Sequence, residues 1–202
     1  RQELIHLLQR QDERYRGRIA TYDPERSGVG FLLATQDAQQ SPQFWSLVRR
    51  LGAARVQLYA NTAPILERIA EGRFLLGYNL LGSYAVAAAI RHPELGIVLP
   101  RDYTLAMSRL ALIPRGAREP DLAREFMDFL LGEEGQRIIA DQAGLYAIHP
   151  WVQGAFTAAA LREELGPALR PIQIGPGLLV YLDQAKRRRF LRQWREALAA
   201  ER

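Results

Sequence analysis

The chain has 202 residues and no cysteine, which excludes disulfide bonds, thiolate metal sites and cysteine nucleophiles. Apolar residues make up 48% of the sequence and charged residues 24%, the balance of a globular protein rather than of a disordered chain. The net charge of +5 comes from arginines spread along the chain, because Lys186 is the only lysine. A dispersed excess of this size is weak support for anionic partners and does not establish nucleic-acid binding.

Targeting signals are not evident in the sequence. Apolar runs such as residues 74–81 are too short to span a bilayer, so no transmembrane segment is expected. The first fifteen residues are amphipathic and lack the uninterrupted apolar core of a secretion signal. A mature exported protein would look the same, so this pattern leaves the compartment open.

The first predicted elements are a helix at residues 2–14 and a short buried strand at residues 19–22. Asp23-Pro24 ends the strand, because proline donates no backbone N–H and biases its neighbour away from helix. Ser27 then caps a helix that contains the apolar residues 31–34. Glycines after this cap leave N–H groups at the positive end of a helix dipole, which can bind an anion. An ordinary capped helix, in which the glycines only turn the chain, is the alternative.

Strands and helices then alternate. Further helices are predicted at residues 43–51, 63–71 and 82–91, with Gly52 as the C-cap of the first and Asn61-Thr62 capping the second. Further strands are predicted at residues 56–59, 74–78 and 97–99. This alternation predicts an α/β fold with a mostly parallel sheet and helices on both faces. Ligands bind such folds at the carboxyl ends of the strands, here the loops 23–30, 59–63 and 78–84.

The second half is less regular. A strand is predicted at residues 106–114, and helices at 120–131, 133–143, 151–165 and 178–198, with a loop at 166–177. The helix that begins at Pro120 has an apolar stripe that predicts burial of Leu122, Phe126, Phe129 and Leu130. The same reasoning predicts burial of five side chains in the last helix: Leu182, Phe190, Leu191, Trp194 and Leu198.

Three stretches carry a resemblance to a known family: GRIATYDPERSGVGF, GRFLLGYNLLGSYA and DYTLAMSRLALIPRGAREPDLAREFMDFLLGEEGQRIIA. They resemble bacterial extracellular solute-binding proteins of ABC importers, most of all the branch related to ferric-iron and phosphonate binders. The ending GPGLLVYLDQAKRRRFLRQWREAL is similar to the C-terminus of that group.

The resemblance implies a periplasmic-binding-protein-like fold with one full lobe and part of a second. It assigns residues 16–107 to the second lobe, and residues 1–15 and 108–150 to the first lobe or the return to it. Residues 151–202 would be a helical segment that crosses between the lobes. The chain thus resembles the later part of such a protein, either as a fragment or as a natural short form.

Candidate ligand residues follow from the same resemblance. Ser27 and Gly28 fall on the family's anion-binding helix start, and the neighbouring Arg26 could add charge. Asn61 and Thr62 could present a second helix start to the cleft, although simple capping is the favoured interpretation. The third loop contributes the candidates Tyr78, Asn79, Ser83 and Tyr84. The two tyrosines could equally well only pack and cap with their hydroxyls, whereas Asn79 and Ser83 could contact an oxygen-rich organic anion.

The expected function is binding of a small anionic or oxygen-rich solute in the periplasm, followed by hinge closure and delivery to an ABC permease. Phosphonates, organophosphates, carboxylates and a ferric complex are the candidate solutes. Ferric binders of this family use adjacent tyrosines, whereas Tyr78 and Tyr84 lie six residues apart, which argues against iron. The alternative is a ligand-sensing domain of a histidine kinase or a transcription regulator.

Other classes find less support. No nucleophile, base or paired-carboxylate motif predicts an enzyme, and the three histidines share no metal-ligand spacing, so neither a cofactor nor a resident metal is expected. The basic run at residues 186–189 could contact nucleic acid, with Phe190 and Trp194 as stacking partners. The favoured interpretation is that this run is the solvated face of a terminal helix. A monomer is expected.

Overall fold

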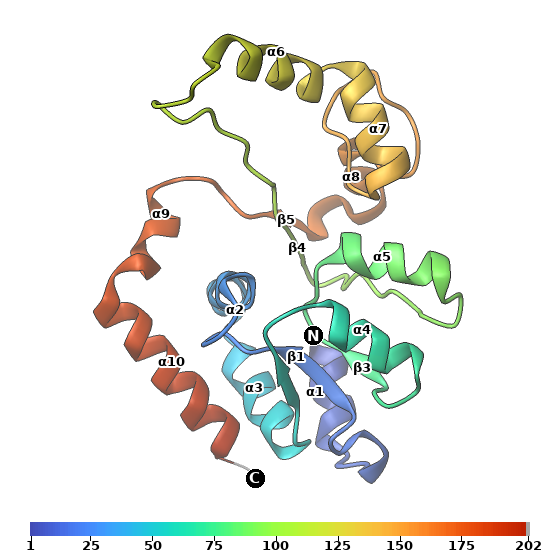
Figure 1. The fold of residues 1–202 in the computed structure, drawn as a ribbon. Coiled ribbons are helices and arrows are strands. Elements are labelled where there is room, and N and C mark those ends of the chain that lie inside the picture. The colour runs from blue at the N-terminus through green and yellow to red at the C-terminus, as the bar shows by residue number, and fades with distance from the viewer. Residues whose placement is uncertain (201–202) are drawn as a thin grey trace. The chain divides into compact units, whose positions relative to one another are not determined.

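A computed structural model describes residues 1–200, apart from the side chain of Tyr181 (Figure 1). The chain forms two compact units. Unit 1 contains residues 1–105 and the chain from Ile172 onward, and unit 2 contains residues 106–171. The chain leaves unit 1 at β4 (Thr104–Ala106) and returns to it after β5 (Leu169–Pro171).

A parallel sheet forms the centre of unit 1. Its strands are β1 (Ile19–Tyr22), β2 (Gln57–Tyr59) and β3 (Leu76–Gly77), in the order β2-β1-β3. Ala20 pairs with Gln57 on one side of β1 and with Gly77 on the other. Every residue of β1 is buried, as expected for a central strand covered on both faces.

Helices cover both faces of this sheet (Figure 1). Because side chains alternate along a strand, Ile19 packs into one core and Ala20 into another. The Ile19 core contains side chains of α1 (Gln2–Gln9), α2 (Gly28–Gln40), α3 (Phe44–Ala53) and α10 (Gln184–Ala199). The Ala20 core contains Ile65 of α4 (Ala63–Ala70). The predicted α/β class, with a parallel sheet and helices on both faces, is confirmed.

The remaining elements of unit 1 are short, apart from α5 (Gly82–Arg91). A 3₁₀ turn, η1 (Glu13–Tyr15), follows α1, and α9 (Pro176–Leu179) and η3 (Val180–Leu182) precede α10. Asp183 caps α10 by accepting a hydrogen bond from the Lys186 N–H, so this helix begins later than predicted. Leu182 is exposed as a result, whereas Phe190, Trp194 and Leu198 are buried.

Unit 2 consists of α6 (Pro120–Leu131), α7 (Glu133–Ala143), α8 (Ala158–Leu165) and a 3₁₀ turn, η2 (Gly166–Ala168). Its buried core is small, with Ala140, Ala147 and Val152 packed beside Phe156. The predicted burial of the α6 stripe is wrong for the described chain. No residue of α6 is buried, and the exposed fractions of Leu122 and Phe126 are 63% and 58%.

Other predicted elements are also absent or shorter in the described chain. The helix predicted at residues 2–14 ends at Gln9, and the strand predicted at residues 74–78 comprises only Leu76–Gly77. Residues 97–99 form no strand, and Val98 is 85% exposed. A strand was predicted at residues 106–114, but the observed strand β4 ends at Ala106 and residues 107–114 have no regular secondary structure. The helix predicted at residues 151–165 begins at Ala158, behind a Thr157 cap that accepts from the Ala160 N–H. Apolar runs alone do not make strands, because a strand also needs a partner for its backbone groups.

The unit boundaries differ from the predicted 16–107. Residues 1–15 belong to the same compact unit as the sheet, because Ile5 and Leu8 are buried in its core. The predicted crossing segment divides near residue 171, with its first part in unit 2 and α10 in unit 1. The assignment of these units to the lobes of a longer protein stays a prediction.

Gly52 is not the C-cap that the sequence predicts, because it lies inside α3. A Cβ at this position would overlap the backbone carbonyl of Leu198, so the glycine permits α10 to approach α3 closely. We expect Gly52→Ala to lower the free energy of unfolding by about 1–3 kcal/mol in urea titrations, the usual range for overpacking. Gly96→Ala is the control, since a Cβ there meets nothing within 4 Å. Equal stability of the two variants would contradict this packing argument.

Candidate functional site

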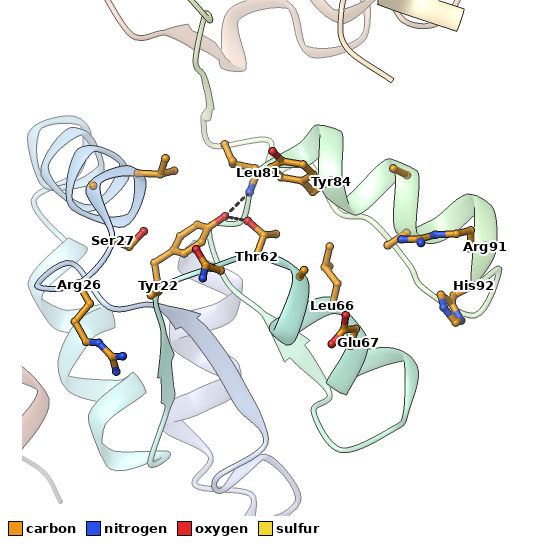
Figure 2. Close-up of a pocket in the computed structure, with 17 residues that line it drawn as sticks. Tyr22, Arg26, Ser27, Thr62, Leu66, Glu67, Leu81, Tyr84, Arg91 and His92 are labelled. Carbon is orange, nitrogen blue, oxygen red and sulfur yellow. Dashed lines mark hydrogen bonds between the residues drawn. The ribbon is translucent and has the colours of Figure 1, made fainter. Parts of the chain in front are cut away.

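A cavity of about 820 Å³ lies in unit 1 at the carboxyl ends of the three parallel strands (Figure 2). Its walls come from the loops that follow β1, β2 and β3, and from the helices that these loops begin. Residues 26–29 form one wall, residues 60–63 and α4 a second, and Leu81 with α5 a third. The cavity therefore lies at the loops that follow the strands, which is where the sequence predicts a ligand site.

The start of α2 presents backbone donors to this cavity. Ser27 has an extended backbone and its hydroxyl accepts a hydrogen bond of 3.1 Å from the Gly30 N–H, which makes it the N-cap. The N–H groups of Gly28 and Val29 have no acceptor among the described residues. Because these N–H groups lie at the positive end of a helix dipole, a ligand anion could accept a hydrogen bond from each of them.

Gly30 fixes how closely α2 approaches the sheet. A Cβ at this position would overlap the Cβ of Tyr22, the last residue of β1. A Cβ at Gly28 would meet nothing within 4 Å. The two glycines therefore differ in role: Gly30 permits packing against the strand, whereas Gly28 faces open space beside the cavity.

The side chain of Tyr22 connects the α4 wall of the cavity to the α5 wall through hydrogen bonds. Its hydroxyl lies within hydrogen-bond distance of the Thr62 hydroxyl at the start of α4, and it accepts a 3.3 Å bond from the Leu81 N–H at the start of α5 (Figure 2). Burial raises the pKa of the Tyr22 phenol, although the bond to Thr62 opposes this effect. Thr62 is therefore engaged with Tyr22, and its side chain does not cap α4 as the sequence predicts. Sequence reasoning missed Tyr22, although its position at a strand end was a usable signal.

Charged side chains lie at the rim. Arg26 extends away from Tyr22 and Thr62, whereas Glu67 of α4 and Arg91 of α5 line the far side of the cavity (Figure 2). His92 lies beside Arg91 and pairs with Glu94 through a 3.3 Å contact. Between the helix starts and these charges the wall is apolar, with Val29, Leu66 and neighbouring alanines. The cavity can thus receive a solute with an anionic end and an organic body.

Comparison with known proteins places this arrangement in a family. Residues 8–161 match the family of bacterial extracellular solute-binding proteins. The chain belongs to that family. A solved structure, the substrate-binding protein of an ABC transporter from Agrobacterium tumefaciens, is 49% identical with a TM-score of 0.90. The match covers 98% of this chain and 58% of that one.

Curated relatives of this family member are more distant. The phosphoglycerate transport regulatory protein PgtC of Salmonella typhimurium is 24% identical over 139 residues, which is 67% of this chain and 34% of the relative. The protein of the same name from Salmonella typhi matches to the same extent. The chain therefore spans about a third of the curated relatives and somewhat more than half of the solved one.

Six of the nine predicted site residues of this solute-binding family member line the cavity: Arg26, Ser27, Gly28, Asn61, Thr62 and Tyr84. Ser83 is not among the lining residues. Tyr78 and Asn79 instead donate hydrogen bonds to the buried carboxylate of Asp37, which sequence reasoning did not single out. Ligand contact by any of these residues stays a prediction.

Metal and membrane features are limited in the part of the chain that the structure describes. Residues 1–200 contain no group of three His, Asp or Glu side chains that could hold a metal ion. Within the same range no helix has both the length and the apolar character needed to cross a membrane.

Proposed function

We propose that this chain is the solute-binding part of an ABC importer and that it binds a small solute through a phosphate, phosphonate or carboxylate group. The observation that carries the proposal is the set of three helix starts around one cavity, with free N–H donors at Gly28 and Val29. Family membership supports solute binding, and the name of the PgtC relatives supports a phosphorylated carboxylate as a first probe.

The proposed mechanism is capture by differential affinity. The anionic group accepts hydrogen bonds from the N–H groups at the start of α2 and contacts the hydroxyl of Tyr84 or Thr62. The organic body lies against Leu66 and Val29. Binding in the periplasm favours a closed arrangement of the whole protein, which an inner-membrane permease then recognises. Affinity differs between the open and closed forms, and this difference supplies the free energy of closure.

Sensing is the second candidate. The PgtC relatives are named transport regulatory proteins, which favours a role in signalling ligand presence. Gene neighbourhood separates the two functions: adjacent permease and ATPase genes support import, whereas an adjacent histidine kinase or transcription regulator supports sensing.

Gly28→Pro tests the helix start directly. Gly28 is the first residue of α2, where proline is well tolerated, and the extended backbone of Ser27 suits a residue before proline. The variant therefore removes one N–H donor while the helix is retained. We expect calorimetric titration with 3-phosphoglycerate or methylphosphonate to show roughly ten- to a hundredfold weaker binding, the effect of one charge-assisted hydrogen bond.

The matched control is Gly28→Ala, which keeps the N–H and adds a Cβ in open space. Its affinity should stay within about threefold of that of the unaltered chain. If the unaltered chain binds an anion and Gly28→Pro binds it equally well, the donors at the α2 start do not contact the ligand. Ferric citrate belongs in the same series, and a tyrosinate charge-transfer band on its addition would favour iron over a simple anion.

A further inference from the structure

Asp37 near the end of α2 is a buried carboxylate in which four side-chain donors converge. Its side chain has no exposed surface. Oδ1 accepts from Arg1 Nε at 2.8 Å and from the Tyr103 hydroxyl, while Oδ2 accepts from the Tyr78 hydroxyl at 2.5 Å and from Asn79 Nδ2 at 3.3 Å. A carboxylate offers about four acceptor positions, so this one is saturated and has no site left for a ligand.

The two phenols act as donors. Burial raises the pKa of Tyr78 and of Tyr103, and the nearby negative charge of Asp37 raises both further. Both hydroxyls therefore carry their protons at neutral pH and point them at Asp37. The Arg1 guanidinium lies 3.5 Å above the Tyr103 ring and balances the charge of the carboxylate.

Two of the donors belong to the loop that begins one wall of the cavity. Asn79 has a left-handed backbone with φ 54°, a conformation that asparagine adopts more readily than most residues other than glycine, and its side-chain amide donates a hydrogen bond to Asp37. Two residues later, the Leu81 N–H donates to the Tyr22 hydroxyl in the cavity wall. The loop from Tyr78 to Leu81 is thus fixed at one end by Asp37 and at the other by Tyr22.

We infer that Asp37 is a positioning residue for the cavity. It lies on the same helix as Ser27 and Gly28, so its bonds fix the start of α2 relative to the start of α5. Asp37 does not contact the ligand and acts through the Tyr78–Leu81 loop. The binding part of this inference rests on the proposed function, whereas the loop-ordering part does not.

Asp37→Asn is the test, because it keeps the shape of the side chain, removes its negative charge and replaces one acceptor oxygen with an NH2 group that faces two donors. Leu198→Ala, which truncates a core side chain of α10 beside α3, is the control for a general loss of stability. Two measurements are made on each variant: hydrogen–deuterium exchange at residues 80–84 and the dissociation constant for 3-phosphoglycerate. Tyr78→Phe, which removes a single donor, serves as the second variant if Asp37→Asn does not fold.

We expect Asp37→Asn to speed exchange at residues 80–84 and to weaken binding about tenfold, while Leu198→Ala leaves both unchanged. If exchange and affinity change equally in the two variants, Asp37 contributes only to overall stability, and the inference is overturned. If the unaltered chain does not bind the probe, the proposed ligand class fails, but the exchange comparison still decides whether Asp37 orders the loop.

Discussion

Asp37→Ala is expected to lower the free energy of unfolding of unit 1 by about 3–5 kcal/mol, the range for removing one partner of a buried ion pair. Arg1 has only 6% of its side chain exposed, so without Asp37 its charge would stay buried and uncompensated. Three further donors, on Tyr78, Asn79 and Tyr103, would lose their acceptor in the same step.

Urea unfolding monitored by tryptophan fluorescence measures this effect. Trp45 and Trp194 belong to unit 1, whereas Trp151 belongs to unit 2 and is 73% exposed. A Trp151→Phe background therefore restricts the signal to unit 1. The control is Glu13→Ala, whose ion pair with Arg16 is exposed on both sides and contributes about 0.5 kcal/mol or less. A loss below about 1 kcal/mol for Asp37→Ala would mean that the buried pair is easily replaced by water.

Unit 1 is also expected to lose stability steeply above about pH 10. Burial raises the pKa values of Tyr78 and Tyr103 above the ordinary value of 10.0, and Asp37 raises them further. Above pH 10 the unfolded chain releases these protons while the folded chain keeps them, so the unfolded state is favoured as pH rises. The contribution of each phenol is complete below pH 10 and falls by roughly 1.4 kcal/mol per pH unit above it.

Urea midpoints measured between pH 8 and pH 11.5 test this linkage. Tyr78→Phe and Tyr103→Phe should each make the fall shallower, because each removes one group that titrates differently in the two states. Tyr84→Phe is the matched control, since Tyr84 is 49% exposed. A wild-type stability that stays flat to pH 11.5 would show that these phenols ionise in the folded chain without resistance.

Much of the fold was predictable from local chemistry. β1 occupies the predicted residues, and Ser27 caps α2 as expected, because an apolar run ended by Asp-Pro and a serine before glycines are signals within a few residues. The same signals located the loops that now surround the cavity. Six predicted site residues meet there because the carboxyl ends of parallel strands meet at one edge of a sheet.

Other predictions failed where a distant partner decided the outcome. Gly52 resembled a helix C-cap, but the approach of Leu198 explains the glycine. Residues 97–99 have the composition of a strand and find no strand partner within the described chain. Thr62 resembled a cap, but the hydroxyl of Tyr22 engages it.

Three features could be predicted from the residues alone: the α/β class, the order of strands and helices in the first ninety residues, and the helix start at Ser27 and Gly28. Local propensity, capping and turn chemistry act between neighbours, so these features are readable without a structure. The hydrogen bonds that Asp37 accepts from Arg1, Tyr78, Asn79 and Tyr103 depend on the folded chain. No motif links those positions, because a buried charge takes whatever partners the folded chain brings within hydrogen-bond distance.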